Sequence, residues 1–387
     1  MSAAAAAPVR RRTDPALQVP SAEALDARIL DAIGVYALDD DAFLDLAREL
    51  FAYQVGTNAP YAAFARAQGF DANRLPDRIE RIPAVPAAAF KDARLATFPP
   101  ARTAVWFETS GTSRGGSGRH ELDTTRLYEA ALLASFDRMM LDGGERLRYL
   151  NLVPDPHERP HSSLGFMLGV VARERGDGRG GWYLHGDELD VDTFAGAAAR
   201  ARADGAAVCV ATTAFALVAL LDALAERNAN LALPAGSRIM ETGGFKGRTR
   251  VVERATLYRE ASARLGIPLD AIVAEYGMTE LSSQYYDDPA GRDHIEPRVK
   301  VAPPWLRAIV VDGDGRPVPE GVVGAIRHVD LANRGSVIAV ETEDLGALVA
   351  GATPHTSGRR LVLFGREQGA ELRGCSLDAE TLLARRG

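Results

Sequence analysis

The chain has 387 residues, of which 47% are hydrophobic and 25% are charged, as in globular proteins with one large domain or two smaller ones. Its formal net charge of -7 and sequence pI near 5.6 argue against a nucleic-acid partner or a broad anionic-membrane surface, because both need a concentrated positive field. Two cysteines, Cys209 and Cys375, are too few for a disulfide framework and favour a reducing, cytoplasmic location. No apolar run reaches the roughly 18 residues of a membrane span.

The first hundred residues predict a tail followed by helices. Residues 1–20 carry alanines and arginines without an apolar segment after the charges, so we expect a disordered tail and no secretion signal. Residues 21–100 predict a helical segment packed on the core, with Ser21 as a helix cap. One face of this segment is apolar, at Phe43, Leu44, Ala47, Leu50 and Phe51.

The rest of the chain predicts an α/β fold. Within residues 101–300, the apolar runs "TAVWF", "VCVATT", "SRIM" and "LDAIVA" each precede a loop or a helical pattern, which is typical of an α/β core. Ligands of such folds gather at the carboxyl ends of the strands, where these loops begin. Residues 301–365 predict strands joined by turns, and so a small β subdomain. Residues 366–387 are expected to form a tail that carries Cys375.

The loop "FETSGTSRGGSGRH", residues 107–120, is the first candidate for chemistry. Its glycines and hydroxyl residues follow a predicted strand and would offer backbone N–H groups and hydroxyls to a phosphate chain. It is not the P-loop of nucleoside triphosphatases, because no Gly-Lys-Ser/Thr follows at the required spacing. A flexible polar loop is the alternative interpretation.

Two later loops are the other candidates. In "METGGFKGR", Gly243 and Gly244 would let the backbone lie flat against a planar ligand, although a plain strand-to-helix turn uses the same glycines. In "YGMTELSSQYYD", Glu280 is suited to a hard cation such as Mg2+, and Tyr276 offers a ring face to a base.

Taken together and in this order, the three loops resemble the core motifs of the adenylate-forming superfamily. The segments "SGTS...SGRH", "ETGGFKGR" and "EYGMTELSSQYYD" are similar to those of the acyl-protein synthetase family, the LuxE-type long-chain-fatty-acid–protein ligases. The resemblance runs from "IPAVPAAAFKD" to the end of the chain. It implies a core like the N-terminal domain of adenylate-forming enzymes, with ATP and Mg2+ as cofactors.

The resemblance also implies a role for each motif. Gly243, Gly244 and Tyr276 would line the adenine, within a motif that continues through Gly277 and Met278. The ATP phosphates would be held by Thr109, Ser110, Gly111, Thr112, Ser113 and Arg119. Arg114 and Arg119 stand where many superfamily members carry a lysine, which keeps the charge but changes its geometry.

Four further residues complete the implied site. Thr279 and Glu280 would meet the phosphates and Mg2+, with Glu280 as the metal ligand. Asp344, in "ETEDLGAL", would bind the ribose hydroxyls, and Arg366, in "FGRE", matches the arginine that follows it in the superfamily.

The C-terminal end predicts how the acyl group is handled. Only 21 residues follow Arg366 and the last lysine is Lys300, so the usual mobile lid domain with its lysine is expected to be lacking. The segment "AELRGCSLDAE" resembles the family's C-terminal segment and places Cys375 where that family carries its acyl group as a thioester. A thiolate is a strong nucleophile. The alternative is a small residue in a terminal turn.

Three other residues have less specific signals. Cys209, inside "AAVCVA", is expected in the core. His157 and His161, in "PDPHERPHSSLGFM", either border the acyl pocket or are solvated, and the following "SLGFMLGVV" either lines an acyl tunnel or is a buried structural helix.

The leading hypothesis is an ATP-dependent ligase that forms an acyl-adenylate from a carboxylic acid, most simply a fatty acid. The acyl group would then move to Cys375 and on to a partner protein, a reductase or a carrier. One alternative is direct transfer from the adenylate to coenzyme A or a carrier thiol. Another is a non-catalytic nucleotide-binding homologue. Glu280, Asp344 and Arg366 together argue against the last.

Overall fold

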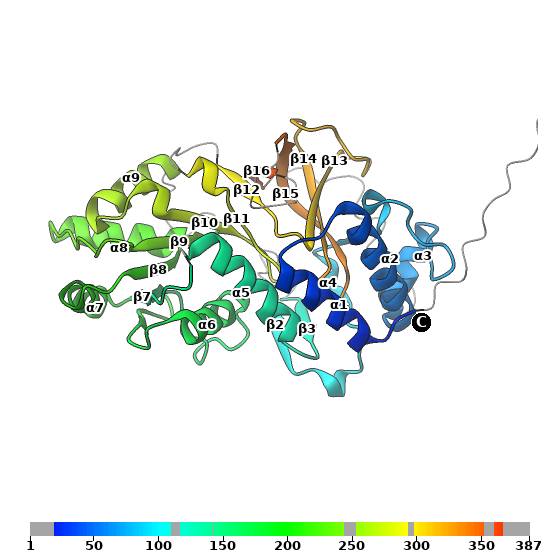
Figure 1. Ribbon diagram of the computed structural model, residues 1–387, viewed down its shortest axis with the longest axis horizontal. Helices are drawn as coiled ribbons and strands as arrows, with labels where there is room; N and C mark the ends of the chain where they lie inside the picture. The colour runs from blue at the N-terminus through cyan, green and yellow to red at the C-terminus, as the bar shows by residue number, and fades with distance from the viewer. Residues whose placement is uncertain are drawn as a thin grey trace, which may run out of the picture.

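A large mixed sheet with helices packed against it organises the molecule, and the fold is α/β (Figure 1). The computed structural model describes residues 19–109, 117–141, 143–243, 253–292, 298–351 and 360–366. Within these residues the main sheet has 12 strands, in the order β13-β14-β15-β16-β12-β11-β10-β9-β8-β4-β5, with β1 paired to β15. In Figure 1 the N-terminal helices lie at one end of this sheet and α7–α9 at the other.

The N-terminal helices start at side-chain caps. The Ser21 hydroxyl accepts from the Ala24 amide, which confirms the predicted cap, and Asp39 and Asn58 cap the next two helices in the same way. Each cap satisfies an amide that the first helical turn leaves without a partner. The helices are α1 (Ala22–Val35), α2 (Asp40–Thr57) and α3 (Ala59–Ala67), followed by the short β1 (Val85–Pro86) and α4 (Ala89–Asp92).

The parallel half of the sheet is covered on both faces. Its strands are β4 (Arg148–Leu152), β5 (Gly181–Trp182), β8 (Val208–Thr213), β9 (Arg238–Thr242) and β10 (Ile272–Tyr276). One face packs on α5 (Arg126–Met140) and α6 (Ser163–Arg175), and the other on α7 (Val191–Asp204), α8 (Ala214–Glu226) and α9 (Arg254–Leu265). Burial on both faces explains the continuous apolar runs of these strands. Cys209 is fully buried on β8, as predicted, and burial raises its pKa to about 12.

The antiparallel half of the sheet curls back on itself. It consists of β11 (Tyr285–Asp287), β12 (Val299–Val301), β16 (Arg360–Arg366), β15 (Ala339–Val349), β14 (Gly324–Asp330) and β13 (Leu306–Val311). Tyr285 on β11 hydrogen-bonds His328 on β14, although three strands separate β11 from β14 in the sheet order. Strands after residue 301 therefore continue the main sheet. The division of the chain into a core and a β subdomain stays a prediction.

Two small hairpins lie outside the main sheet. One is β2 (Val105–Glu108) with β3 (Arg119–Leu122), and the other is β6 (Leu184–His185) with β7 (Glu188–Leu189). The first flanks the Gly- and Ser-rich loop. None of the helices in the described part of the chain is long and apolar enough to cross a membrane.

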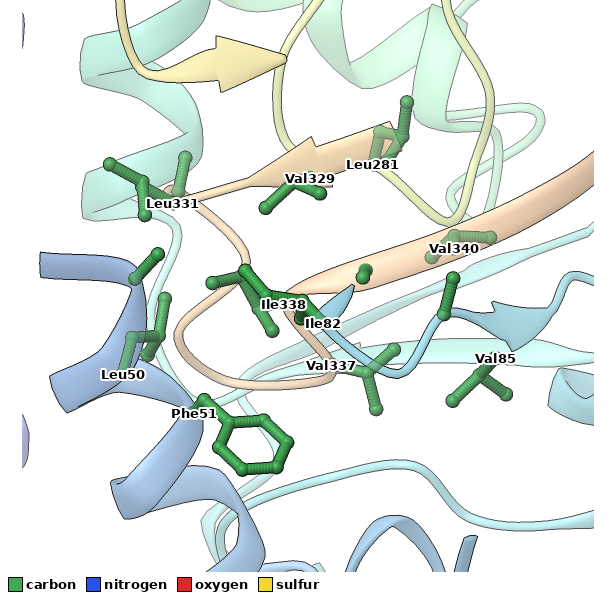
Figure 2. Close-up of a cluster of buried hydrophobic side chains, with 14 of the residues drawn as sticks. Leu50, Phe51, Ile82, Val85, Leu281, Val329, Leu331, Val337, Ile338 and Val340 are labelled. Atoms are coloured by element: carbon green, nitrogen blue, oxygen red, sulfur yellow. The ribbon is translucent and has the colours of Figure 1, made fainter. Parts of the chain in front are cut away.

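An apolar core joins the N-terminal helices to the strands that carry the candidate site. Figure 2 shows Leu50 and Phe51 of α2 near Ile338, which follows the turn between β14 and β15. Leu281, from the loop after β10, lies in the same core with Val329 and Val340 (Figure 2). This core fixes the position of that loop relative to β14 and β15.

Candidate functional site

The loop that joins β10 to β11, residues 277–284, is the centre of the candidate site. Tyr276 and Tyr285 are cross-strand partners at its base. The Thr279 hydroxyl donates to the carbonyl of Glu108 at 3.2 Å and so accepts from the Ser163 hydroxyl at 3.1 Å. The Thr279 carbonyl accepts from His120 Nδ1 at 2.7 Å. One residue thus links β2, β3 and the first turn of α6.

Burial keeps His120 neutral, and the contact with Thr279 selects one tautomer. Burial lowers its pKa to about 4, and Nδ1 carries the proton because a carbonyl can only accept. His120 Nε2 is consequently a buried acceptor, for which the structure gives no hydrogen-bond partner. The neutral ring supports the loop without adding a charge.

The hairpin of β2 and β3 closes the stem of the Gly- and Ser-rich loop. The Thr109 amide donates to the Gly118 carbonyl at 3.0 Å, and the Gly118 amide donates to the Thr109 hydroxyl at 2.9 Å. A Cβ on Gly118 would lie 2.7 Å from the Phe90 backbone, so only glycine fits there. The predicted phosphate ligands Ser110, Gly111, Thr112 and Ser113, together with Arg114, lie outside the described residues.

Arg119 lies over an aromatic stack beside this stem. Its guanidinium is 4.2 Å from the Trp106 ring centroid, and His161 stacks on Trp106 with ring centroids 3.4 Å apart. The His161 carbonyl accepts from the Glu108 amide at 2.9 Å, and His161 Nδ1 donates to the Trp106 carbonyl at 3.2 Å. His161 is therefore part of the site's frame. The exposed His157 has no comparable link to this stack.

Tyr276, at the base of the loop, contacts Asp344, and this contact is separate from those of Thr279. The Tyr276 hydroxyl donates to Asp344 Oδ2 at 2.8 Å, and His328 Nε2 lies 3.3 Å from the same hydroxyl. His328 Nδ1 lies 2.8 Å from the Tyr285 hydroxyl. Burial raises the pKa of both tyrosines well above the usual value and lowers that of His328 to about 4. The backbone of Arg366 pairs with Asp344 across β15 and β16.

Asp330, the last residue of β14, and Asn333, in the turn after it, form hydrogen bonds with the second half of the loop. Glu280 is 7% exposed, and its carbonyl accepts from Asn333 Nδ2 at 2.8 Å. The Ser282 amide and the Ser283 hydroxyl donate to the Asp330 carboxylate at 2.9 and 2.8 Å. Burial raises the pKa of Asp330 to about 6 even though these hydrogen bonds favour the charged form.

A buried carboxyl group precedes Tyr276. Glu275 is 6% exposed, accepts from the Thr242 hydroxyl, and has its pKa raised by burial to about 7. A Cβ on Gly277 would lie 2.6 Å from Glu275 Oε1, so this carboxyl group fills the space behind the start of the loop. Thr242 pairs with Glu275 across β9 and β10, and Gly243, with φ of 83°, follows it. Gly244 lies outside the described residues.

A buried ion cluster centred on Asp287 of β11 links this strand to β10 and β12. Asp287 Oδ1 accepts from Lys300 Nζ at 2.7 Å, and Asp287 Oδ2 accepts from the Ala274 amide at 2.7 Å and from Arg298 at 2.9 Å. Burial opposes ionisation of Asp287, but Lys300 and Arg298 outweigh it and hold the pKa of the carboxyl group below its usual value. Lys300 therefore serves to hold strands of the sheet together.

The structure brings most of the described candidate residues to one end of β10. Thr109, Arg119, Tyr276, Thr279, Glu280 and Asp344 all come from the elements that surround the loop after β10, with Gly243 on the neighbouring strand. Cys375 lies outside the described residues. Among those described, no three His, Cys, Asp or Glu side chains form a metal-binding group. Glu280 alone still suits Mg2+, which in nucleotide enzymes is often held by one or two carboxylates plus phosphate oxygens.

Three buried residues of the site were not predicted. His328, Asp330 and Asn333 are each fully buried and support Tyr276 or the loop after it. In the sequence, "HVDLANRGSV" reads as the end of a strand and a turn. The only signal was a histidine and an aspartate inside an otherwise apolar strand pattern.

The comparisons with solved structures agree with this fold. An open conformation of 2-hydroxyisobutyryl-CoA ligase in complex with 2-HIB-AMP and CoA matches with a TM-score of 0.64 and 15% identity, over 84% of this chain and 74% of that one. The same ligase in its thioesterification state, with the same ligands, gives a TM-score of 0.65 and 15% identity, over 84% and 68%. The α/β fold with its large mixed sheet resembles the structures of adenylate-forming ligases.

The family follows from a sequence model. The model described as "Acyl-protein synthetase, LuxE" matches residues 38–383, so the chain belongs to the LuxE acyl-protein synthetase family. None of the curated proteins matches the chain in sequence.

Proposed function

We propose that the chain uses ATP to convert a carboxylic acid, most simply a fatty acid, to an acyl-adenylate, and then passes the acyl group through Cys375 to a partner protein. Membership of the LuxE family supports an acyl-protein synthetase activity of the adenylate-forming type. The observation that carries the proposal is the convergence of Tyr276, at the end of β10, with Thr279 and Glu280 of the following loop, beside Asp344 and the Thr109–Gly118 stem. In this proposal these groups would serve a base, a ribose and a phosphate chain.

Each group has a role in the first half-reaction. Tyr276, Gly243 and Gly244 would line the adenine, within the segment that includes Gly277 and Met278, and Asp344 would accept from the ribose hydroxyls. Thr279 and the loop Thr109–Ser113 would hold the phosphates. A substrate carboxylate oxygen attacks the α-phosphorus, the bond from that phosphorus to the bridging oxygen breaks, and pyrophosphate leaves with the electron pair.

The reaction brings anions together, so the site must supply positive charge. Arg119 and Arg366 are the arginines proposed to do this, since preorganised donors lower the cost of the charge that develops on the phosphates. Mg2+ bound at Glu280 would supply further charge neutralisation and orient the phosphates. The Arg119 guanidinium lies over the Trp106 ring, and this contact would favour one orientation of the guanidinium.

The second half-reaction is assigned to Cys375. Its thiolate attacks the acyl carbonyl carbon, the bond to the phosphate oxygen breaks, and AMP leaves with the electron pair. The thioester would then be attacked by a nucleophile on a partner protein, a reductase or a carrier. Direct transfer from the adenylate to coenzyme A or a carrier thiol is the competing route.

The first test is pyrophosphate release from Mg2+-ATP, screened over fatty, aryl and amino acids. We expect release to depend on at least one class of carboxylic acid. ATP binding without release for any acid would favour a non-catalytic nucleotide-binding homologue.

The second test separates the two routes of transfer with a radiolabelled acid that passes the screen. Wild type should retain label after denaturation, and hydroxylamine should remove it, because a thioester is cleaved by that reagent. Cys375→Ala should still release pyrophosphate but retain no label. Cys209→Ala is the matched control and should behave as wild type, since Cys209 is buried in the core. Label retained by Cys375→Ala contradicts the acyl-enzyme step.

A further inference from the structure

Four side chains at and behind the proposed ribose subsite form a continuous chain of hydrogen bonds. Tyr285 contacts His328 at 2.8 Å, His328 contacts Tyr276 at 3.3 Å, and Tyr276 contacts Asp344 at 2.8 Å. The residues come from β11, β14, β10 and β15, so the chain of bonds crosses the interior of the curled sheet. Tyr285 and His328 are fully buried, and no water or ligand can reach them without opening the sheet.

The direction of every bond in this chain can be assigned from donors and acceptors. The Tyr276 hydroxyl uses its one proton toward Asp344, so its oxygen can only accept from His328. His328 Nε2 therefore carries the ring proton and Nδ1 is bare. The Tyr285 hydroxyl must then donate to Nδ1. Tyr285 thus fixes the tautomer of His328, which in turn fixes the direction in which the Tyr276 proton points.

The opposite polarity would weaken the bond from Tyr276 to Asp344. If His328 Nδ1 carried the proton, Nε2 would become an acceptor and would compete with Asp344 for the Tyr276 proton. At the far end, Asp330 and Arg307 affect the pKa of Tyr285, whereas the pKa of His328 depends on burial and on Asp344. Only the polarity that starts at Tyr285 pairs all four groups, because buried polar groups without partners are costly.

We infer that Tyr285 and His328 are positioning residues that orient Asp344, through Tyr276, for the recognition of a ribose in preference to a deoxyribose. Asp344 Oδ2 is held by Tyr276, which sets the plane in which the carboxylate meets the sugar hydroxyls. This inference rests on the proposed function for its nucleotide substrate. It adds that the selectivity for a ribonucleotide depends on two residues that touch no part of the nucleotide.

The test compares the affinities of the full-length protein for ATP, 2′-deoxy-ATP and 3′-deoxy-ATP, measured by calorimetry with Mg2+. Wild type should bind ATP about 10–100-fold more tightly than at least one deoxy analogue, as expected for a lost hydrogen bond to a charged group. Tyr285→Phe should reduce that ratio about 3–10-fold, and Tyr276→Phe should reduce it further. Tyr286→Phe is the matched control. The neighbouring tyrosine is also buried, its hydroxyl has no hydrogen-bond partner among the described residues, and its loss should leave the ratio unchanged.

The tautomer itself gives a second measurement, which does not depend on nucleotide binding. In protein labelled with 15N-histidine, the His328 signals should show a protonated Nε2 and a bare Nδ1, with the assignment made by loss of these signals in His328→Asn. Tyr285→Phe should shift them toward a mixture of tautomers.

The possible failures can be told apart. No ATP binding by folded wild type would overturn the proposed function. ATP binding with an unchanged ratio in folded Tyr285→Phe and Tyr276→Phe, or a protonated Nδ1 in wild type, would overturn the positioning role alone.

Discussion

The two sides of the loop after β10 are held in different ways. On the Tyr276 side, the support is a chain of side-chain hydrogen bonds whose inner members, His328 and Tyr285, are fully buried. On the Thr279 side, the Glu108 carbonyl of β2, the buried His120 ring of β3 and the Ser163 hydroxyl of α6 meet at one residue. The first side is built from strands of the main sheet, and the second is assembled from separate segments.

This difference matches what each side is proposed to bind. Adenosine stays in place when the α-phosphorus reacts, so a fixed subsite on the Tyr276 side is suited to it. The phosphate chain is cleaved and pyrophosphate departs, so contacts assembled from several segments are better suited to the Thr279 side. We therefore expect substitutions on the Thr279 side to change rates, and those behind Tyr276 to change stability and selectivity.

The largest effect is expected at Glu280. Glu280→Gln keeps the shape of the side chain but removes the charge proposed to hold Mg2+ against the phosphates. We expect acyl-adenylate formation to fall about 10²–10³-fold, the range seen when one transition-state contact is removed. Pyrophosphate release measures this loss, with an acid identified by the screen.

The matched control for this variant is Glu343→Gln. Glu343 lies next to Asp344 in the sequence but is exposed, so its neutralisation should leave the rate unchanged. Equal rates for the Glu280 variant and wild type would contradict the assignment of the phosphate side.

A substitution at Asn333 should mainly lower the stability of the fold, whereas that at Glu280 should mainly lower the rate. Asn333→Ala removes two donated bonds, to the carbonyls of Glu280 and Val337, and the bond accepted from Ser282. All are buried, so the groups left behind have no water to replace them. We expect the free energy of unfolding to fall by about 2–4 kcal/mol. Urea unfolding measures it, and the exposed Asn230→Ala should change it little.

The sequence indicated candidate residues on both sides but not the contacts that support them, for a physical reason. Thr279 and Glu280 lie in a short motif whose residue types suit phosphate and Mg2+, and the α/β pattern and the Ser21 cap are local signals. The supporting bonds join residues 116 to 171 positions apart at Thr279. Behind Tyr276 they join residues 43 to 68 positions apart, in strands that meet only because the sheet curls. Periodicity along the chain contains no information about that closure. His328 therefore gave no signal beyond a polar residue in an apolar strand.

The Tyr276 side can be tested through the pH dependence of stability, because it contains the buried Glu275. Its pKa is raised by burial from 4.5 to about 7, so the fold favours the neutral form. That stabilisation is complete below pH 4.5 and is lost as the pH rises through about 7. Glu275→Gln should remove the dependence, so the free energy of unfolding of the variant relative to wild type should rise by about 2–3 kcal/mol between pH 5 and pH 8. Urea unfolding at the two pH values gives this difference, and a difference that does not vary with pH contradicts the burial of a titrating group.

The smallest effect is expected from the aromatic stack on the phosphate side. Arg119→Lys keeps the charge but loses the planar guanidinium that lies on Trp106 at 4.2 Å. Because Arg119 is exposed, the cation–π contact should contribute only about 0.5–1 kcal/mol to the free energy of unfolding. The exposed Arg126→Lys, on α5, is the control and should change neither stability nor activity. If the stack serves mainly to orient Arg119 toward the phosphates, Arg119→Lys should raise the KM for ATP by a larger factor than its small loss of stability implies. An unchanged KM with the expected loss of stability would make the stack a structural feature of the β2–β3 hairpin, and would leave Thr109, Thr279 and Glu280 as the described residues proposed to meet the phosphate chain.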